Sequence, residues 1–83
     1  MCYLLVCRSL TYAQRTEKTL ERAKVTSVII RIPQAISTDG CGYCLKVPER
    51  YFKNALAALK DTELYPKKVY VLYDNGDYVE VNV

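Results

Sequence analysis

The chain has 83 residues, 51% apolar and 25% charged, which are ordinary proportions for a soluble globular protein. A chain of this length forms one domain, here residues 1–83, with a thin core and any active site at its surface. Its 12 Lys and Arg against 9 Asp and Glu leave a net charge of +3, which is too small to make nucleic acid the expected partner. Histidine is absent, so Ser-His and Cys-His dyads are excluded.

Four cysteines, about 5% of the chain, fall below the roughly 8 to 10% that marks a secreted disulfide scaffold. The apolar stretch Cys2–Cys7 is shorter than the apolar core of a signal peptide, which needs about 7 to 15 residues. No apolar run approaches the roughly 18 residues of a transmembrane helix. We therefore expect a cytoplasmic protein with reduced thiols and no membrane partner.

The N-terminal third is predicted to form a strand and then a helix. The continuous apolar run Met1–Cys7 suits a strand that is buried on both faces. Ser9 or Thr11 can cap a helix that continues to about Lys24. The helical period places four residues on one inward stripe, namely Ala13, Thr16, Leu20 and Ala23.

The middle of the chain is predicted to form a strand, a loop, another strand and then a helix. Val25–Ile32 is rich in β-branched residues and predicts the second strand. Pro33–Gly42 has the composition of a loop, and Tyr43–Val47 predicts a short third strand. Pro48 suits the first position of a helix that runs to about Lys60. Its inward residues are expected to be Tyr51 or Phe52, with Ala55, Leu56 and Leu59.

The C-terminal segment predicts a hairpin. Val69–Tyr73 and Tyr78–Val83 flank a turn that contains Asn75-Gly76, the strongest short hairpin signal. With right-handed crossovers, the first six elements are expected to form a split β-α-β sandwich, ferredoxin-like (βαββαβ) and of the α+β class, with both helices on one face of the sheet. The last strand extends this sheet at an edge.

The strongest chemical motif is a Cys-x-x-Cys formed by Cys41 and Cys44. Gly40 and Gly42 flank the first thiol and let the backbone approach a partner closely. Thioredoxin-like proteins place such a pair before a helix, whereas here it leads into a strand, so that fold is disfavoured. Strand alternation puts Cys44 on the same face as Lys46, where it is either a packed residue or a resolving thiol.

The expected topology also places positive charge near Cys41. The third strand runs antiparallel to the first, so its start lies beside Cys7, where the first helix begins. The helix N-terminus near Ser9 and the charge of Arg8 are expected to favour a thiolate at Cys41. These residues and the flanking Gly40 and Gly42 form the predicted binding set.

The other cysteines are expected to be structural. Cys2 and Cys7 lie five positions apart in one strand and point to opposite faces. They cannot both join Cys41 and Cys44, and a bare pair lacks two of the ligands of structural zinc. We therefore predict no metal site and no cofactor.

Aromatic and basic residues give no clear sign of nucleic-acid binding. The eight tyrosines include Tyr70 and Tyr73 on the predicted hairpin, but these differ in strand parity and cannot line one face. Cross-strand packing is the better explanation for them. Lys67-Lys68 is expected to be solvated surface.

Several short motifs of the chain match one known family. They are Tyr3-Leu4-Leu5-Val6, Ser9, Ala13 through Glu17-Lys18-x-Leu20, Pro33-x-x-Ile36-Ser37, Cys41-Gly42 and Leu45-Lys46-Val47. Over residues 1 to about 60 the chain thus resembles the selenium/sulfur carrier-like family of small bacterial proteins. Members of this family are expected to carry a single Cys-Gly pair, and the resemblance implies that Cys41 is the cysteine of that pair. Cys44 stands where Ala or Ser is more usual, which favours a one-cysteine mechanism.

Three functions remain open from the sequence. In the first, Cys41 carries a persulfide or perselenide from a protein donor to a protein acceptor, as a carrier and not a turnover enzyme. In the second, the domain is a regulatory or interaction module with structural cysteines, and the edge formed by Val79, Val81 and Val83 mediates a homodimer. In the third, Cys41 and Cys44 form a dithiol oxidoreductase.

Overall fold

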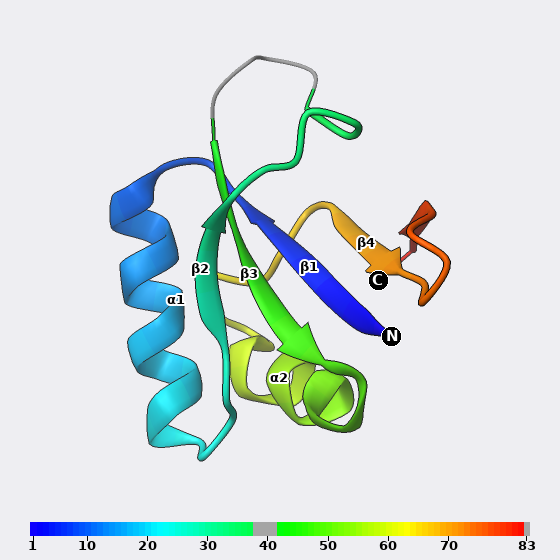
Figure 1. Cartoon of the computed structure of the whole chain (residues 1–83). Helices are drawn as coiled ribbons and strands as arrows, with labels where there is room; N and C mark the ends of the chain where they lie inside the picture. The colour runs from blue at the N-terminus through cyan, green and yellow to red at the C-terminus, as the bar shows by residue number, and fades with distance from the viewer. Residues whose placement is uncertain (38–41, 83) are drawn as a thin grey trace.

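The computed structural model describes residues 1–37 and 42–82. This part of the chain forms two α-helices and five strands, which confirm the α+β class. Figure 1 shows how they are arranged. The elements in chain order are β1 (Cys2–Cys7), α1 (Leu10–Arg22), β2 (Val28–Arg31), β3 (Tyr43–Pro48), a 3-10 turn (Glu49–Tyr51), α2 (Phe52–Leu59), β4 (Val69–Leu72) and β5 (Tyr78–Val81).

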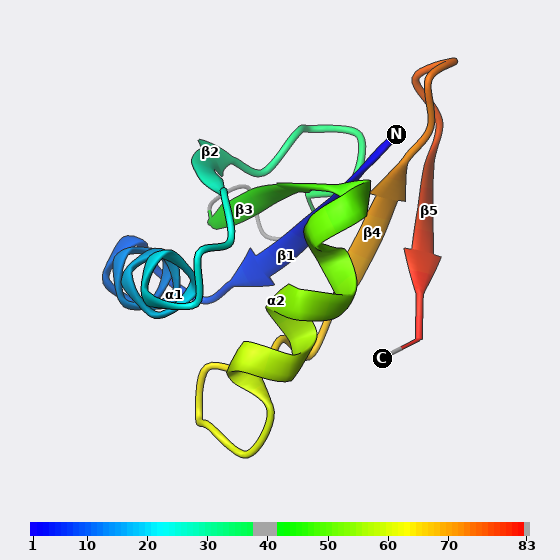
Figure 2. The same cartoon turned by 90° about the horizontal axis from the view of Figure 1, so that it is seen from below.

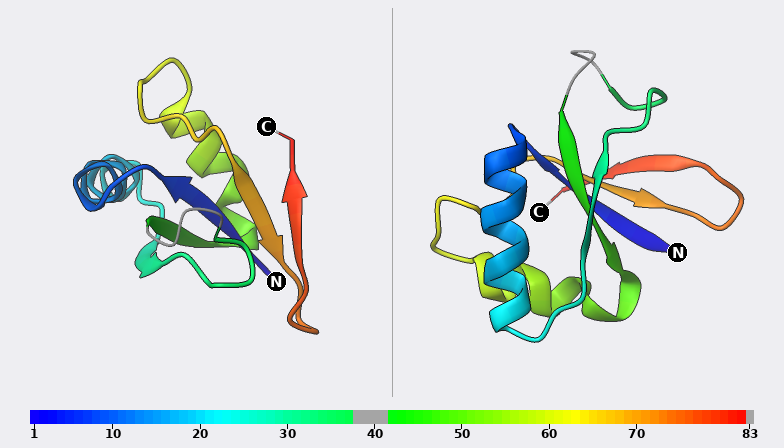
Figure 3. Two further views of the ribbon diagram at one scale, coloured as in Figure 1. Left: turned by 90° about the horizontal axis from the view of Figure 1, so that it is seen from above. Right: turned by 60° about the vertical axis from the view of Figure 1, so that its left-hand side comes forward.

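The strands form one antiparallel sheet in the order β2-β3-β1-β4-β5. Cys7 pairs with Tyr43, so the end of β1 meets the start of β3, as the sequence predicted. Figures 2 and 3 show both helices on one face of the sheet, and the segment that follows β2 on the opposite face. The extra strand β5 lies at the sheet edge beside β4, again as predicted.

The main core lies between the sheet and the two helices. Leu5 pairs with Leu45 on one side and with Val69 on the other, so these three side chains form a row across the sheet. Leu20 of α1 and Leu59 of α2 pack against that row, and all five side chains are buried. This core is thin, as expected for a chain of this length.

The start of the second strand was predicted wrongly, because α1 ends in a Schellman motif. The amide of Lys24 donates to the Glu21 carbonyl at 2.9 Å and that of Val25 donates to the Leu20 carbonyl at 2.8 Å, while Lys24 takes φ 62°. An apolar residue directly after the left-handed one frequently accompanies this motif, because it packs back on the last turn of the helix. Val25 is therefore a buried helix-capping residue, and β2 begins only at Val28.

The predicted helix boundaries also need correction. Ala23 was expected on the buried stripe of α1, but it is the C-cap and is exposed. Pro48 was expected to open the second helix, but it ends β3 with ψ 147°, and the 3-10 turn separates it from α2. Phe52 instead begins α2, and its ring stacks on Tyr3 of β1 with centroids 3.7 Å apart.

The predicted hairpin is confirmed, although its strands are shorter than expected. Gly76 adopts φ 93°, a conformation that glycine tolerates best. The turn is closed by the Tyr73 amide, which donates to the Asp77 carbonyl at 2.9 Å. The strands themselves end at Leu72 and Val81.

Candidate functional site

A groove of about 370 Å³ lies at the end of the sheet where β1 finishes and α1 begins. Five parts of the chain line it: the β1–α1 junction, the first turns of α1, the two ends of the loop between β2 and β3, the connection from α2 to β4, and Tyr70 of β4. Residues distant in sequence therefore meet here because of the antiparallel order of the sheet. Its lining includes the predicted site residues Arg8 and Gly42.

Gly42 forms a fixed end of the loop between β2 and β3. Its carbonyl accepts a hydrogen bond from the Ile32 amide at 3.2 Å, directly beyond the β2–β3 ladder. Its φ of 135° disfavours other residues, and a Cβ atom here would lie 2.8 Å from Ile32 Cδ1. Glycine is thus favoured at this position mainly by its backbone conformation, and any larger residue would also have to displace the end of the Ile32 side chain.

Ser9 and Arg8 are both occupied with contacts around the first turn of α1. Ser9, one of the two predicted caps, is the N-cap, and its Oγ accepts a hydrogen bond from the Tyr12 amide at 3.3 Å. The Arg8 guanidinium carbon lies 4.6 Å from the centre of the Tyr12 ring. No acidic residue occurs in the first turn of α1, so Arg8 and the helix dipole make this end of the groove positive.

The predicted thiol Cys41 and the predicted binding residue Gly40 lie outside the described residues. Their neighbours along the chain do line the groove, because Ser37 and Gly42 both belong to it. Cys41 is bonded directly to Gly42. Gly42 is therefore the described residue that lies next to Cys41 in the chain.

Cys44 lies in the third strand and is fully buried. Burial, with smaller effects of Cys7 and Cys2, raises the pKa of its thiol from 9.0 to about 12. A thiol with this pKa is protonated at neutral pH, and the thiolate is the reactive form. Cys44 pairs with Val6 and Ile30 of the neighbouring strands, which suits a packed residue.

Cys7 lines the groove but is half-buried against the core cluster. Its Sγ lies 3.6 Å from the Leu5 carbonyl oxygen. Burial raises the pKa of this thiol, and a hydrogen bond with Thr16 opposes the rise. Cys2 is half-buried at the opposite end of β1. The prediction that the two point to opposite faces agrees with the alternation along β1.

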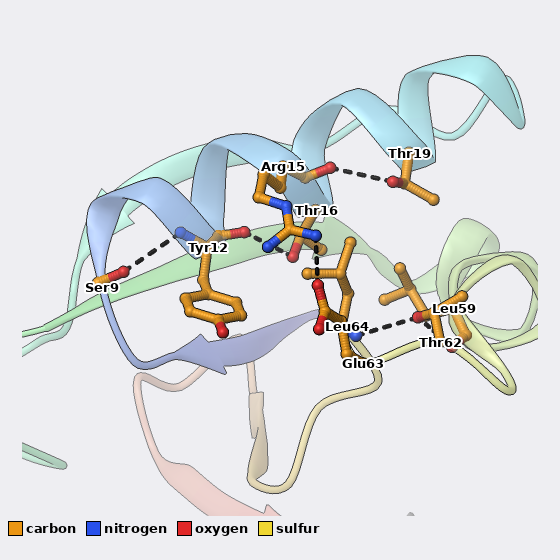
Figure 4. A network of polar contacts seen from close by, with 9 residues as sticks. All are labelled: Ser9, Tyr12, Arg15, Thr16, Thr19, Leu59, Thr62, Glu63 and Leu64. Atoms are coloured by element: carbon orange, nitrogen blue, oxygen red, sulfur yellow. Dashed lines mark hydrogen bonds and ion pairs between the residues drawn. The ribbon is translucent and has the colours of Figure 1, made fainter.

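The connection from α2 to β4 was missed as part of the site. Lys67 and Lys68, expected to be plain solvated surface, line the groove together with Tyr65. Figure 4 shows how the connection is held: the Arg15 side chain of α1 forms an ion pair with Glu63. The sequence Tyr-Pro-Lys-Lys after the second helix was the signal that could have indicated this part of the site. No local pattern, however, shows which end of the sheet that segment reaches.

The described residues contain no group of three or more His, Cys, Asp and Glu side chains placed to hold a metal ion. Neither α1 nor α2 is long and apolar enough to span a membrane.

A model of the family described as "Putative Se/S carrier protein-like" matches residues 2–71. The match extends from the start of β1 into β4 and so includes the groove and the Cys41-Gly42 pair. No curated protein and no solved structure matches the chain.

Proposed function

The chain belongs to the Se/S carrier protein-like family, and on this premise we propose that Cys41 carries a sulfur or selenium atom between two protein partners. The observation that supports this most directly is the anchoring of Gly42, the residue bonded to Cys41, at the rim of the groove. A carrier needs one reactive thiol on a rigid scaffold and needs no histidine or deep pocket.

The ferredoxin-like arrangement that we propose for the first six elements is supported by the observed strand order.

The proposed transfer is a thiol exchange. The Cys41 thiolate attacks the outer sulfur of a donor persulfide, forming a new S–S bond as the donor's S–S bond breaks. The donor leaves as a thiolate, and its former terminal sulfur remains on Cys41 as a persulfide. No electrons enter or leave the system. For selenium, the outer sulfur is replaced by a selenium atom.

The residues around the groove support the anionic form of such a thiol. Arg8 and the dipole of α1 supply positive charge at the end of β1, with no carboxylate in the first turn of the helix. Cys44, which is buried and has a raised pKa, enters this proposal as a structural residue.

The test is persulfide loading resolved to each cysteine. The purified protein is incubated with a cysteine desulfurase and cysteine, and peptides are then analysed by mass spectrometry. We expect one extra sulfur atom on the Cys41 peptide and none on the Cys7 or Cys44 peptides. Cys41→Ser should abolish loading, and Cys7→Ala is the matched control that should retain it. Absence of sulfur on Cys41 under these conditions would contradict the carrier function.

A homodimer is a second proposal, supported by β5. Val79 pairs with Val71 on the helix-bearing face of the sheet, yet its side chain is 47% exposed. The adjacent Glu80 is also exposed, and an edge strand of this kind can pair with another strand. Sedimentation of the wild-type chain should show a dimer that Val79→Lys dissociates, whereas Cys41→Ser keeps it. A monomer at high micromolar concentration would contradict this proposal.

A further inference from the structure

We infer that the groove binds a small carboxylate-bearing thiol of about tripeptide size, as the low-molecular-weight donor or acceptor for the carrier. The role given to the ligand's sulfur rests on the proposed function. The binding surface itself is formed only by residues that the structure describes. Three features of that surface support it: its charge, its apolar lining and its size.

The charge of the groove favours an anionic ligand. Among the lining residues that the structure describes, Arg8, Lys67 and Lys68 carry positive charge and Glu63 carries negative charge. Glu63 is already paired with Arg15, which lies outside the lining. No carboxylate in residues 1–37 or 42–82 forms an ion pair with any of the three cations. Their charge is therefore available to a ligand's carboxylates.

The positive groups come from separate elements on the groove wall. Arg8 precedes α1, whereas the two lysines precede β4. The Lys68 carbonyl accepts a hydrogen bond from the Val6 amide at 3.0 Å, which fixes the lysine segment against the end of β1. Two sources of positive charge suit a ligand with more than one carboxylate.

The rest of the lining suits a short organic ligand. Apolar side chains contribute a large share of the surface, and the rings of Tyr12 and Tyr65 stand among the charged residues. The apolar members are Val6, Ile32, Ile36, Leu64 and Pro66. Small-molecule sites share this combination of apolar walls and a few fixed polar groups. An inorganic anion would make no use of these walls.

The size of the groove favours a small molecule over a protein surface. Its volume of about 370 Å³ lies at the lower end of the roughly 300–1,000 Å³ of small-molecule sites. Thiols are the leaving groups and acceptors of persulfide exchange, so a carboxylate-bearing thiol combines the required charge, size and chemistry.

Binding is tested with an unreactive probe, S-methylglutathione, which has two carboxylates and no free thiol. Titration followed by calorimetry and by amide NMR shifts should show saturable binding, with shifts at Arg8, Tyr12 and Lys68. The diethyl ester of the probe should bind at least about fivefold more weakly because it lacks both carboxylates. Binding should also weaken with added salt.

Charge-neutral variants identify the site. The double variant Lys67→Gln/Lys68→Gln should bind the probe at least about fivefold more weakly. The matched control is Lys53→Gln/Lys60→Gln, which removes the same charge from exposed positions outside the groove and should retain wild-type affinity. Equal losses in the two variants would show only a response to net charge and would overturn the inference.

Two competing ligands provide further outcomes. If inorganic phosphate binds as tightly as the probe, the groove is an unspecific anion site. A hexapeptide of glutamate that binds more tightly would point to an acidic protein segment. Either result would overturn the assignment to a small thiol.

Loading experiments separate this inference from the carrier function. Glutathione persulfide should load Cys41 in the wild-type protein and less well in Lys67→Gln/Lys68→Gln, whereas loading from a desulfurase should be less affected. Probe binding without loading from any donor would refute the carrier function and leave the groove assignment standing. Desulfurase loading without probe binding would refute the groove assignment alone.

Discussion

Cys44 shows at the scale of one residue how the sheet determines thiol chemistry. It belongs to the Cys-x-x-Cys motif, but its position in β3 buries it and raises the pKa of its thiol. A motif that suggests redox chemistry in the sequence therefore contains one thiol whose protonation is fixed by packing. The expected consequence is a pH dependence of stability.

Between pH 9 and 12 the free energy of unfolding should fall as pH rises. Unfolding returns Cys44 from a pKa of about 12 to its ordinary 9.0, so in this window the unfolded chain has lost a proton that the native chain keeps. Below pH 9 both states hold the proton and Cys44 contributes no slope. Urea unfolding at several pH values should show a smaller fall in Cys44→Ala than in the wild type. Parallel curves would contradict this.

Gly42→Ala should destabilise the protein by about 1 to 3 kcal/mol, because a Cβ meets Ile32 Cδ1 while φ stays in the glycine-favoured region. Ile32→Val removes that Cδ1 atom and should recover part of the loss in the double variant. Gly76→Ala is the control, since it has a positive φ but open space around the new Cβ. Urea denaturation measures all four. A Gly42→Ala loss no larger than that of Gly76→Ala would rule out the clash.

At the scale of an element, α1 orients the groove through both of its ends. Its N-terminus, capped by Ser9, carries Tyr12 into the groove lining. Its C-terminus turns sharply at Lys24 and places Val25 in the core, which sets where β2 begins. The helix therefore contributes to the groove at its N-terminus and determines the start of β2 at its C-terminus.

Lys24→Gly should raise the free energy of unfolding by about 0.5 to 1 kcal/mol. Lys24 has φ 62°, and a left-handed conformation is less costly for glycine than for lysine. Lys18→Gly, an exposed position inside α1, should instead lower it by about 1 kcal/mol. Thermal and urea unfolding of the two variants should therefore shift in opposite directions. Shifts of the same sign would contradict the Schellman assignment.

At the scale of the whole molecule, one thin core supports the fold. The total free energy of unfolding expected for 83 residues is roughly 4 to 12 kcal/mol. A single central row of side chains across β1, β3 and β4 contributes much of it. Damage to that row should therefore affect every element, including the distant groove.

Leu45→Ala should cost about 2 to 5 kcal/mol, a large part of the total free energy of unfolding. Leu45 is fully buried and pairs with Leu5 and Ile29. Val28→Ala on the outer strand, where the side chain is 53% exposed, should change stability by less than about 0.5 kcal/mol. Circular dichroism during urea unfolding compares them. Similar losses in the two variants would contradict the central role of the row.

The sequence by itself determined the α+β class, the order of the elements, the choice of Ser9 or Thr11 as helix cap and the Asn75-Gly76 turn. These depend on local periodicity, capping and turn chemistry, which act over a few residues. It also assigned the alternating faces of Cys2, Cys7 and Cys44, because strand parity is a local property.

Only the tertiary structure decided what meets at the end of the sheet. The strand order brings Lys67 and Lys68 into the lining of the same groove as Arg8, although 59 positions separate Arg8 from Lys67 in the chain. The capping role of Val25 was equally hidden, because a β-branched run has the same pattern whether it forms a strand or closes a helix. Contacts between distant segments depend on how all the layers pack together, and no short stretch of sequence contains that information.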